Sequence, residues 1–208
     1  VFRKFKVGAV FAVPNLDSLG GVSSPLMTSL LANCSTKVSF GNCTPAAVIY
    51  GGCKIYGGIN MNVLVTGGAG YIGSHVCVEL LQSGHDVVVI DDFSNSKPEA
   101  LDAIHEITGK KVKFYEFNVL DEDKTEAVFK ENKLDAVIHC AAFKAVGESV
   151  VKPIEYYTNN LMTTLVVAKL MKKYHVPSIV FSSSATVYGD PKVVPLTEDC
   201  ELGQTTNP

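Results

Sequence analysis

Several features that would assign this chain to a class at once are missing. There is no run of about 18 apolar residues, so we expect neither a membrane span nor a membrane partner. The net charge of −3 leaves no basic excess for nucleic acid. The six cysteines form no Cys-x-x-Cys pair, so we expect neither a disulfide scaffold nor a metal site. Reduced thiols indicate an intracellular protein, and we predict a cytoplasmic one.

Acidic residues are scarce in residues 1–60, where Asp17 is the one acid against five basic residues. The segment is rich in glycine, serine, threonine and asparagine. It could be an organelle transit peptide, but the amphipathic helix with clustered arginines is missing. We therefore predict that residues 1–60 are a poorly ordered, non-homologous extension that differs in kind from the rest of the chain. At most we expect a strand near 46–50. Met61 would then be the native start.

A glycine motif follows Met61. A short apolar run ends at Thr66, Gly67, Gly70 and Gly73 follow at a spacing of three, and apolar residues then recur at helical spacing. This order predicts a strand, a turn and a helix. Glycines let the backbone approach a pyrophosphate, and the helix N-terminus offers it free N–H groups.

Asp91 ends the next apolar run, 18 residues after Gly73. At this distance a carboxylate can accept hydrogen bonds from both adenosine ribose hydroxyls and would repel a 2′-phosphate. The pattern favours NAD over NADP. An ordinary aspartate at a strand end is the alternative.

Apolar runs alternate with helical patterns along the rest of the chain. We predict strands at 62–66, 86–90, 113–117, 136–140 and 179–182, and helices at 72–83, 98–108, from 121, and at 153–174. In the last helix we expect Leu161, Leu165, Ala168 and Leu170 to face inward. This alternation predicts an α/β fold, a doubly wound parallel sheet of Rossmann-like type with its ligand at the carboxyl ends of the strands.

Four segments carry a resemblance to a known family: TGGAGYIGSH at 66–75, HCAAFKAVGES at 139–149, YYTNN at 156–160 and FSSSATVYG at 181–189. Together they resemble the UDP-glucose 4-epimerases of the extended short-chain dehydrogenase/reductase family. The resemblance covers residues 61–208 and not 1–60. It implies an NAD-binding domain at 61–208 that is incomplete at its C-terminus, truncated before the later strands and the substrate domain. Without those strands we expect an exposed apolar sheet edge.

The resemblance implies an isomerase of galactose metabolism that interconverts UDP-galactose and UDP-glucose through a 4-keto intermediate, with tightly bound NAD. UDP-hexose is the implied substrate, and the full-length protein could be a homodimer. The family base is a tyrosine with a lysine four residues later, expected here directly after Pro208. Tyr188 and Lys192 have that spacing, but Gly189 and Pro191 between them predict a turn. We therefore expect the 208 residues alone to be inactive.

Residue roles follow from the same resemblance. Ser184 matches the catalytic serine, and Ser184 and Thr186 would contact the substrate. The implied cofactor contacts are Gly67, Gly70, Tyr71, Ile72, Gly73, Asp91, Asp92, Asn95, Ser96, Asn118, Val119, Cys140, Ala141, Ala142, Lys144, Asn159 and Ser182. The family usually has aspartate where Asn118 stands.

Alternatives remain for several of these residues and for the function. Lys144 could be a solvated loop lysine, Asn159 could pair with local backbone, and His139 is expected to be structural. A sugar-nucleotide 4,6-dehydratase would need an Asp-Glu pair after the serine, where this chain has Ala185 and Thr186. A non-catalytic NAD-sensing module without the tyrosine also remains open.

Overall fold

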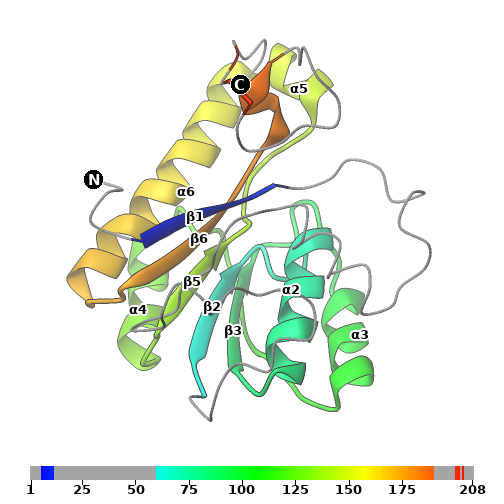
Figure 1. Cartoon of the computed structure of the whole chain (residues 1–208), viewed down its shortest axis with the longest axis vertical. Coiled ribbons are helices and arrows are strands. Elements are labelled where there is room, and N and C mark those ends of the chain that lie inside the picture. Colours follow the sequence, from blue (N-terminus) through cyan, green and yellow to red (C-terminus); the bar gives the residue numbers. More distant parts are fainter. Residues whose placement is uncertain (1–5, 12–59, 190–199, 202, 204–208) are drawn as a thin grey trace.

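The structure is a computed structural model that describes residues 6–11, 60–189, 200, 201 and 203 of the chain. One parallel sheet has helices on both faces (Figure 1). The strand order is β1-β6-β5-β2-β3-β4. The strands are β1 (Lys6–Phe11), β2 (Asn62–Thr66), β3 (Asp86–Asp91), β4 (Lys113–Glu116), β5 (Ala136–His139) and β6 (Ser178–Ser183). The predicted Rossmann-like α/β fold is confirmed.

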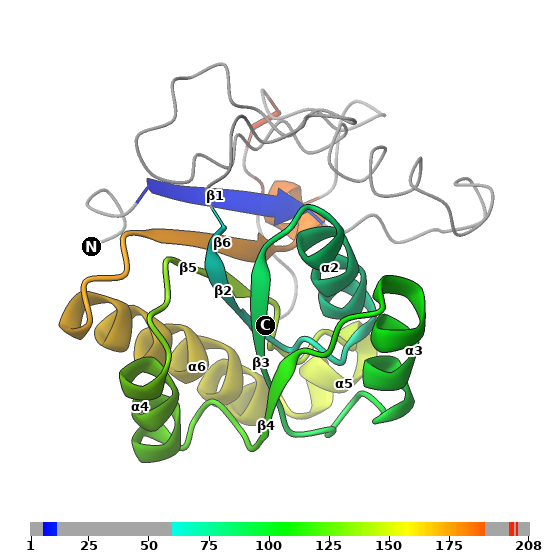
Figure 2. The same ribbon diagram turned by 90° about the horizontal axis from the view of Figure 1, so that it is seen from below.

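Two helical layers cover the sheet. Figure 2 shows α2 (Tyr71–Gln82) and α3 (Glu99–Thr108) on one face, with α4 (Glu122–Glu131) and α6 (Pro153–Lys173) on the other. Neighbouring residues of one strand serve opposite layers, since side chains alternate along a strand. In β2, Val63 and Val65 pack with α2 and α3, whereas Leu64 joins the cluster under α4 and α6.

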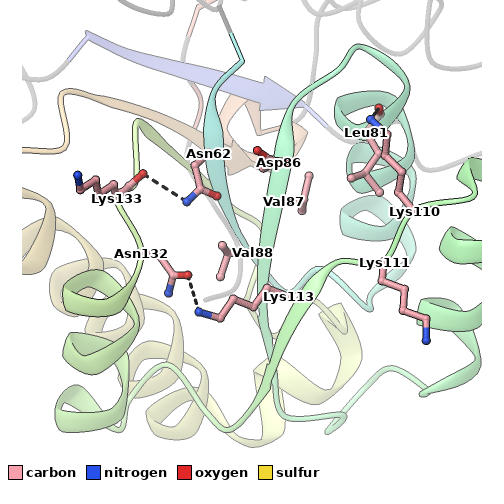
Figure 3. Close-up of a pocket in the computed structure, with 10 residues that line it drawn as sticks. All are labelled: Asn62, Leu81, Asp86, Val87, Val88, Lys110, Lys111, Lys113, Asn132 and Lys133. Atoms are coloured by element: carbon pink, nitrogen blue, oxygen red, sulfur yellow. Dashed lines mark hydrogen bonds between the residues drawn. The ribbon is translucent and has the colours of Figure 1, made fainter.

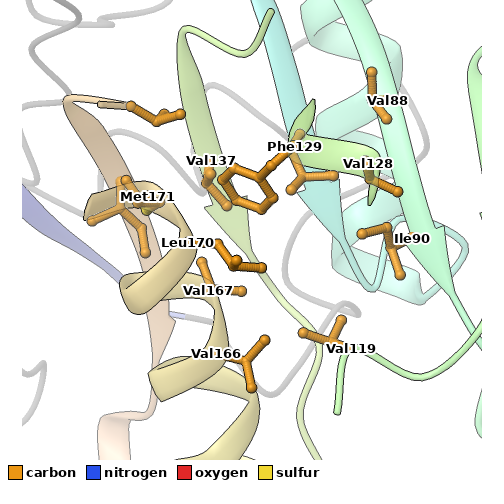
Figure 4. Packing of buried hydrophobic residues seen from close by; sticks show 13 residues of the cluster. Val88, Ile90, Val119, Val128, Phe129, Val137, Val166, Val167, Leu170 and Met171 are labelled. Atoms are coloured by element: carbon orange, nitrogen blue, oxygen red, sulfur yellow. The ribbon is translucent and has the colours of Figure 1, made fainter. Parts of the chain in front are cut away.

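The cluster under α4 and α6 is the larger of the two (Figure 4). Phe129 of α4 and Leu170 and Met171 of α6 meet Val137 of β5 there. These residues are almost completely buried. Burying a side chain of this size contributes about 1.5–3 kcal/mol. This layer therefore holds α6 against the strands whose carboxyl ends carry the candidate site.

Local signals explain where the helices begin and end. The Asp121 carboxylate accepts from the backbone N–H of Lys124 and caps α4. Gly109 follows α3 in the left-handed region, at φ +68°. Gly84, two residues after α2, also has positive φ, whereas the C-cap itself is Ser83. The predicted boundaries agree with the structure to within one or two residues.

Two expectations about the helices are wrong. Leu161 and Leu165 of α6 point outward and are 58% and 55% exposed, although inward positions were predicted. The buried face of α6 includes Asn159 and Thr163 as well as apolar residues, so apolar spacing alone does not identify it. A short helix, α5 (Val146–Val151), was not predicted.

The N-terminal segment differs from its prediction as well. No strand was expected before residue 46, yet β1 pairs in parallel with β6 from Lys6 beside Ser178 to Phe11 beside Ser183. The outer side of β6, expected to be an exposed edge, is therefore paired by backbone. The outer edge of a strand offers unpaired N–H and C=O groups that another segment can satisfy, and this explains the difference. The predicted strand near 46–50 and residues Lys192 and Pro208 lie outside the described residues.

No helix in the part of the chain that the structure describes has the length and hydropathy needed to cross a bilayer.

Candidate functional site

The glycine turn joins the end of β2 to the start of α2. The Gly67 N–H donates to the carbonyl of Ile90 on β3, and the Gly70 N–H donates back to the Gly67 carbonyl. Gly67 has φ +71°, which glycine adopts without strain. A Cβ at Gly73 would lie 2.1 Å from the Gly67 oxygen, so α2 can start this close to the turn because residue 73 has no side chain.

The N-terminus of α2 is suited to an anion. Gly70 caps the helix without a side-chain hydrogen bond, and the first turn contains no acidic residue. Tyr71, Ile72 and Gly73 form that turn, and Tyr71 is half exposed. No acid within the first turn of α2 offsets the partial positive charge of the helix end, unlike in α3 and α4.

Asp91 lies at the end of β3 and is 9% exposed. Its Oδ2 accepts from the Ala69 N–H at 3.0 Å, and its Oδ1 accepts from the Phe93 N–H at 3.0 Å and from Ser96 Oγ at 2.6 Å. Asp91 thus joins the glycine turn to the loop after β3. The spacing of Asp91 from Gly73 indicated a ribose-binding carboxylate, but it did not indicate the hydrogen bond with Ala69.

Asp92 and Asn118 meet across the neighbouring loops. Asn118 Nδ2 donates to Asp92 Oδ2 at 2.6 Å, and Asn118 Oδ1 accepts from the Leu120 N–H. Burial alone would raise the pKa of Asp92, but hydrogen bonds from Ser94 and Asn118 outweigh it and leave that pKa below its usual value. An amide at position 118 complements this carboxylate, whereas an aspartate would repel it.

Three other predicted contacts border this region. Val119 is buried in the core beside β3, so its side chain packs against the protein. Asn95 is exposed in the loop after β3, and Ser96 is directed at Asp91.

The loop after β5 passes close to the glycine turn. A Cβ at Gly67 would lie 2.8 Å from the Ala141 nitrogen, so the two backbones are in direct contact. Ala142 and Lys144 are exposed in this loop. Burial raises the pKa of the Cys140 thiol to about 12, despite an opposing hydrogen bond with Ser182, so the thiol stays protonated. Cys140 and Ser182 are thus neighbours. The sequence predicted that their strands end at the same edge of the sheet, but it did not predict this contact.

The remaining predicted residues lie on α6 and after β6. Asn159 is buried, and its Nδ2 donates to Asn160 Oδ1 at 3.1 Å, a contact between two side chains and not the backbone pairing named as its alternative role. Ser184 is exposed directly after β6. Thr186 follows in the short helix η2 (Ala185–Tyr188). Gly189 has φ +61°, so the chain turns after Tyr188.

The structure brings most of these residues to one edge of the sheet. In the parallel register Thr66 pairs with Ile90 and His139, and His139 pairs with Phe181. Asp91 is therefore at the carboxyl end of its strand, and the glycine turn, Cys140 and Ser184 directly follow the carboxyl ends of theirs. In α/β sheets this is the edge where ligands bind.

A pocket of about 650 Å³ lies at the opposite edge, where β2, β3 and β4 begin (Figure 3). Four lysines line it with Asp86, but they do not converge: Lys110 donates to the Leu81 carbonyl and Lys113 to Asn132, while Lys111 and Lys133 point apart. This pocket is separate from the candidate site.

Among the described residues, no group of three or more histidine, cysteine, aspartate or glutamate side chains could hold a metal ion. Among the described cysteines, Cys77 and Cys140 form no disulfide. The carboxyl edge of the sheet thus combines a backbone cradle suited to an anion, the carboxylate of Asp91 beside it, and Ser184 after β6.

A parallel sheet with a glycine turn between an inner strand and a helix defines a Rossmann-like α/β protein. The chain belongs to the NAD dependent epimerase/dehydratase family, whose model matches residues 63–208.

Several relatives of known name are similar in sequence to 71% of this chain. A UDP-glucose 4-epimerase of Haemophilus influenzae is 60% identical over 148 residues, covering 71% of this chain and 44% of the relative. One of Bacillus subtilis is 59% identical over 148 residues, covering 71% and 43%. A solved structure of UDP-glucose 4-epimerase from Bifidobacterium longum in complex with NAD+ and UDP is 58% identical, with a TM-score of 0.69, covering 71% of this chain and 44% of that one. The chain thus spans less than half the length of these relatives.

Proposed function

We propose that the parent protein is a UDP-glucose 4-epimerase, an isomerase that interconverts UDP-galactose and UDP-glucose with bound NAD. The observation that carries this proposal is the 60% identity over 148 residues to a relative of that name. The activity is assigned to the parent protein because the chain spans 44% of that relative. The same similarity disfavours a 4,6-dehydratase or a non-catalytic NAD-sensing module.

The residues at the carboxyl edge fit NAD. The glycine turn is a cradle that a Cβ would fill, and the first turn of α2 contains no acidic residue. The N–H groups of Tyr71, Ile72 and Gly73 would hold the pyrophosphate. Asp91 would accept from the adenosine ribose and disfavour a 2′-phosphate, with Asp92, Asn95, Ser96, Asn118 and Val119 around the adenosine. When bound, NAD would supply the hydride chemistry.

The loop after β5 and the end of β6 would serve the reacting end of the site. Ala141 lies directly against the glycine turn, Ala142, Lys144 and Asn159 would contact the cofactor, and Ser182 supports Cys140. Ser184 would donate to the oxygen of the sugar 4-hydroxyl and hold it in position for proton removal. Thr186 would contact the same sugar. The base is expected from the tyrosine predicted after Pro208.

Assay of the parent protein for conversion of UDP-galactose to UDP-glucose tests the proposal. Ser184→Ala should lower kcat by about a hundredfold with a small change in KM, because its hydrogen bond matters in the transition state. Ser183→Ala, one residue earlier in β6, is the matched control and should retain activity. A parent protein that binds NAD but does not interconvert the two sugars would refute the proposal.

A homodimer and a cytoplasmic location complete the proposal. The outer face of α6 has Ile154, Tyr157, Leu161 and Leu165 at helical spacing, each more than half exposed. An apolar stripe of this kind is suited to a second copy of the same helix. The free, buried thiols of Cys77 and Cys140 support a reducing compartment.

A further inference from the structure

His139 stands at the centre of a buried hydrogen-bond chain that the proposed function does not use. It is the last residue of β5 and 2% exposed, and its ring stacks on Phe181 with centroids 5.9 Å apart. Its Nδ1 lies 2.6 Å from Thr66 Oγ1 on β2, and its Nε2 lies 3.2 Å from Thr164 Oγ1 on α6. Both ring nitrogens thus have hydroxyl partners on different elements.

The direction of each hydrogen bond can be assigned. Thr164 Oγ1 lies 2.8 Å from the Asn160 carbonyl, which can only accept, so the Thr164 hydrogen is already used. Thr164 must then accept from His139, which places the imidazole proton on Nε2. Burial lowers the pKa of His139 to about 4, so the ring is neutral at pH 7 and its Nδ1 is an acceptor. Thr66 Oγ1 therefore donates to Nδ1.

The chain ends on the loop after β5 at two points. The Ala141 N–H donates to Thr66 Oγ1 at 3.4 Å. Asn160, whose carbonyl takes the Thr164 hydrogen, holds Phe143 through both backbone groups: Oδ1 accepts from its N–H at 2.8 Å, and Nδ2 donates to its carbonyl at 2.9 Å. Residues 141 and 143 are thus connected through Thr66 of β2, His139 of β5 and residues of α6.

We propose that His139 is a positioning residue, held as the neutral Nε2–H tautomer, that fixes the loop 140–145 and with it the NAD contacts of that loop. The inference rests on the proposed function, because Ala141, Ala142 and Lys144 lie on this loop. A reversed tautomer would set two acceptors, the bare Nε2 and Thr164 Oγ1, against each other. The same chain determines how closely Ala141 approaches Gly67, where no space is left for a Cβ.

Adjacent threonines on α6 provide a matched pair of variants. Thr163 and Thr164 both donate to the carbonyl four residues earlier, but only Thr164 meets His139. Thr164→Val should speed amide hydrogen exchange at Ala141 and Phe143 and weaken NAD binding, each by about tenfold. Thr163→Val should change neither by more than about twofold. Thr66→Val should act like Thr164→Val, and Thr66→Ser, which keeps the hydroxyl, should restore the original values.

The tautomer gives an independent reading that needs no cofactor. The ¹⁵N chemical shifts of His139 in the unaltered chain should show a protonated Nε2 and a bare Nδ1. A protonated Nδ1, or equal effects of Thr163→Val and Thr164→Val on exchange, would overturn the inference. If the unaltered chain binds no NAD, the proposed cofactor role fails, while tautomer and amide exchange still decide whether His139 positions the loop.

Discussion

Asp91 is held by three donors from the protein before any ligand is considered. Its role in recognising ribose is therefore combined with a structural one, because its two oxygens keep the glycine turn against the loop after β3. Two carboxylate oxygens provide about four acceptor positions, so about one position remains for a hydroxyl of a ligand.

Asp91→Asn should lower both stability and NAD affinity. The new amide would direct a donor at the N–H of Ala69 or Phe93, and such a mismatch costs about 1–3 kcal/mol. The loss of charge should also narrow the preference for NAD over NADP. Urea unfolding and titration with the two nucleotides measure these effects. Asp102→Asn, exposed on α3, is the control. Unchanged stability and affinity would contradict the assigned role of Asp91.

Acid should weaken the fold through His139. Burial lowers the pKa of His139 in the folded state from 6.5 to about 4. The unfolded chain therefore takes up a proton below pH 6.5 that the folded chain refuses until about pH 4. Stability that is fully present above pH 6.5 is lost as the pH falls toward 4, to the extent of about 3 kcal/mol.

His139→Phe should flatten the fall in unfolding free energy between pH 6.5 and 4, measured by urea unfolding at several pH values. The variant should be less stable at pH 7.5, since Thr66 loses its acceptor, but less sensitive to acid. His85 contributes in the same direction, because burial lowers its pKa against the opposing effect of Asp86, and that part remains in the variant. An unchanged slope would show that His139 is charged or exposed.

Helix α6 separates what local sequence determines from what it does not. Its position, between Pro153 and Lys173, follows from a proline at the first turn and basic residues at the last. Its orientation does not, because apolar residues occur around most of its circumference. Leu161 and Leu165 were therefore assigned to the wrong face, while polar Asn159 and Thr163 are buried.

The outward face of α6 gives a prediction about assembly. Leu161→Glu and Leu165→Glu should each favour the monomer by at least about tenfold, because a carboxylate would be buried between two copies. Sedimentation equilibrium of the parent protein measures this. Ile107→Glu, an equally exposed apolar position on α3, should leave assembly unchanged. Equal assembly of all three variants would place the dimer contact elsewhere or exclude it.

The sequence predicted those parts of the site whose residues lie close together in the chain, and it missed those whose residues lie far apart. The glycine turn and Asp91 depend on spacing within about one helix and two strands, so they could be recognised from residues alone. The chain through Thr66, His139 and Thr164 could not, because its partners come from β2, β5 and α6 and share no local pattern. The hydrogen bond from Asn118 to Asp92 likewise could not be predicted without the fold, because the two residues lie in different loops.

At the scale of the whole molecule, β1 is the outermost strand beside β6 and pairs its outer side. In a parallel pair, alternate residues direct their N–H groups to the partner strand. Of Gly8→Pro and Ala9→Pro, one should therefore remove a bond to β6 and the other should not. We expect the variant that removes the bond to raise amide exchange along Ser178–Ser183 at least about tenfold and to promote self-association. Exchange and light scattering measure this, and equal behaviour of the two variants would argue against the pairing.

The pairing of Lys6 with Ser178 also has a consequence for how the protein is made. During translation β1 leaves the ribosome before the other described strands, but its partner appears only after the central strands and α6 have been synthesised. Contacts between such distant segments form late and slow folding. The nascent chain must therefore carry an unpaired strand through most of its synthesis, which makes this stage dependent on chaperone protection.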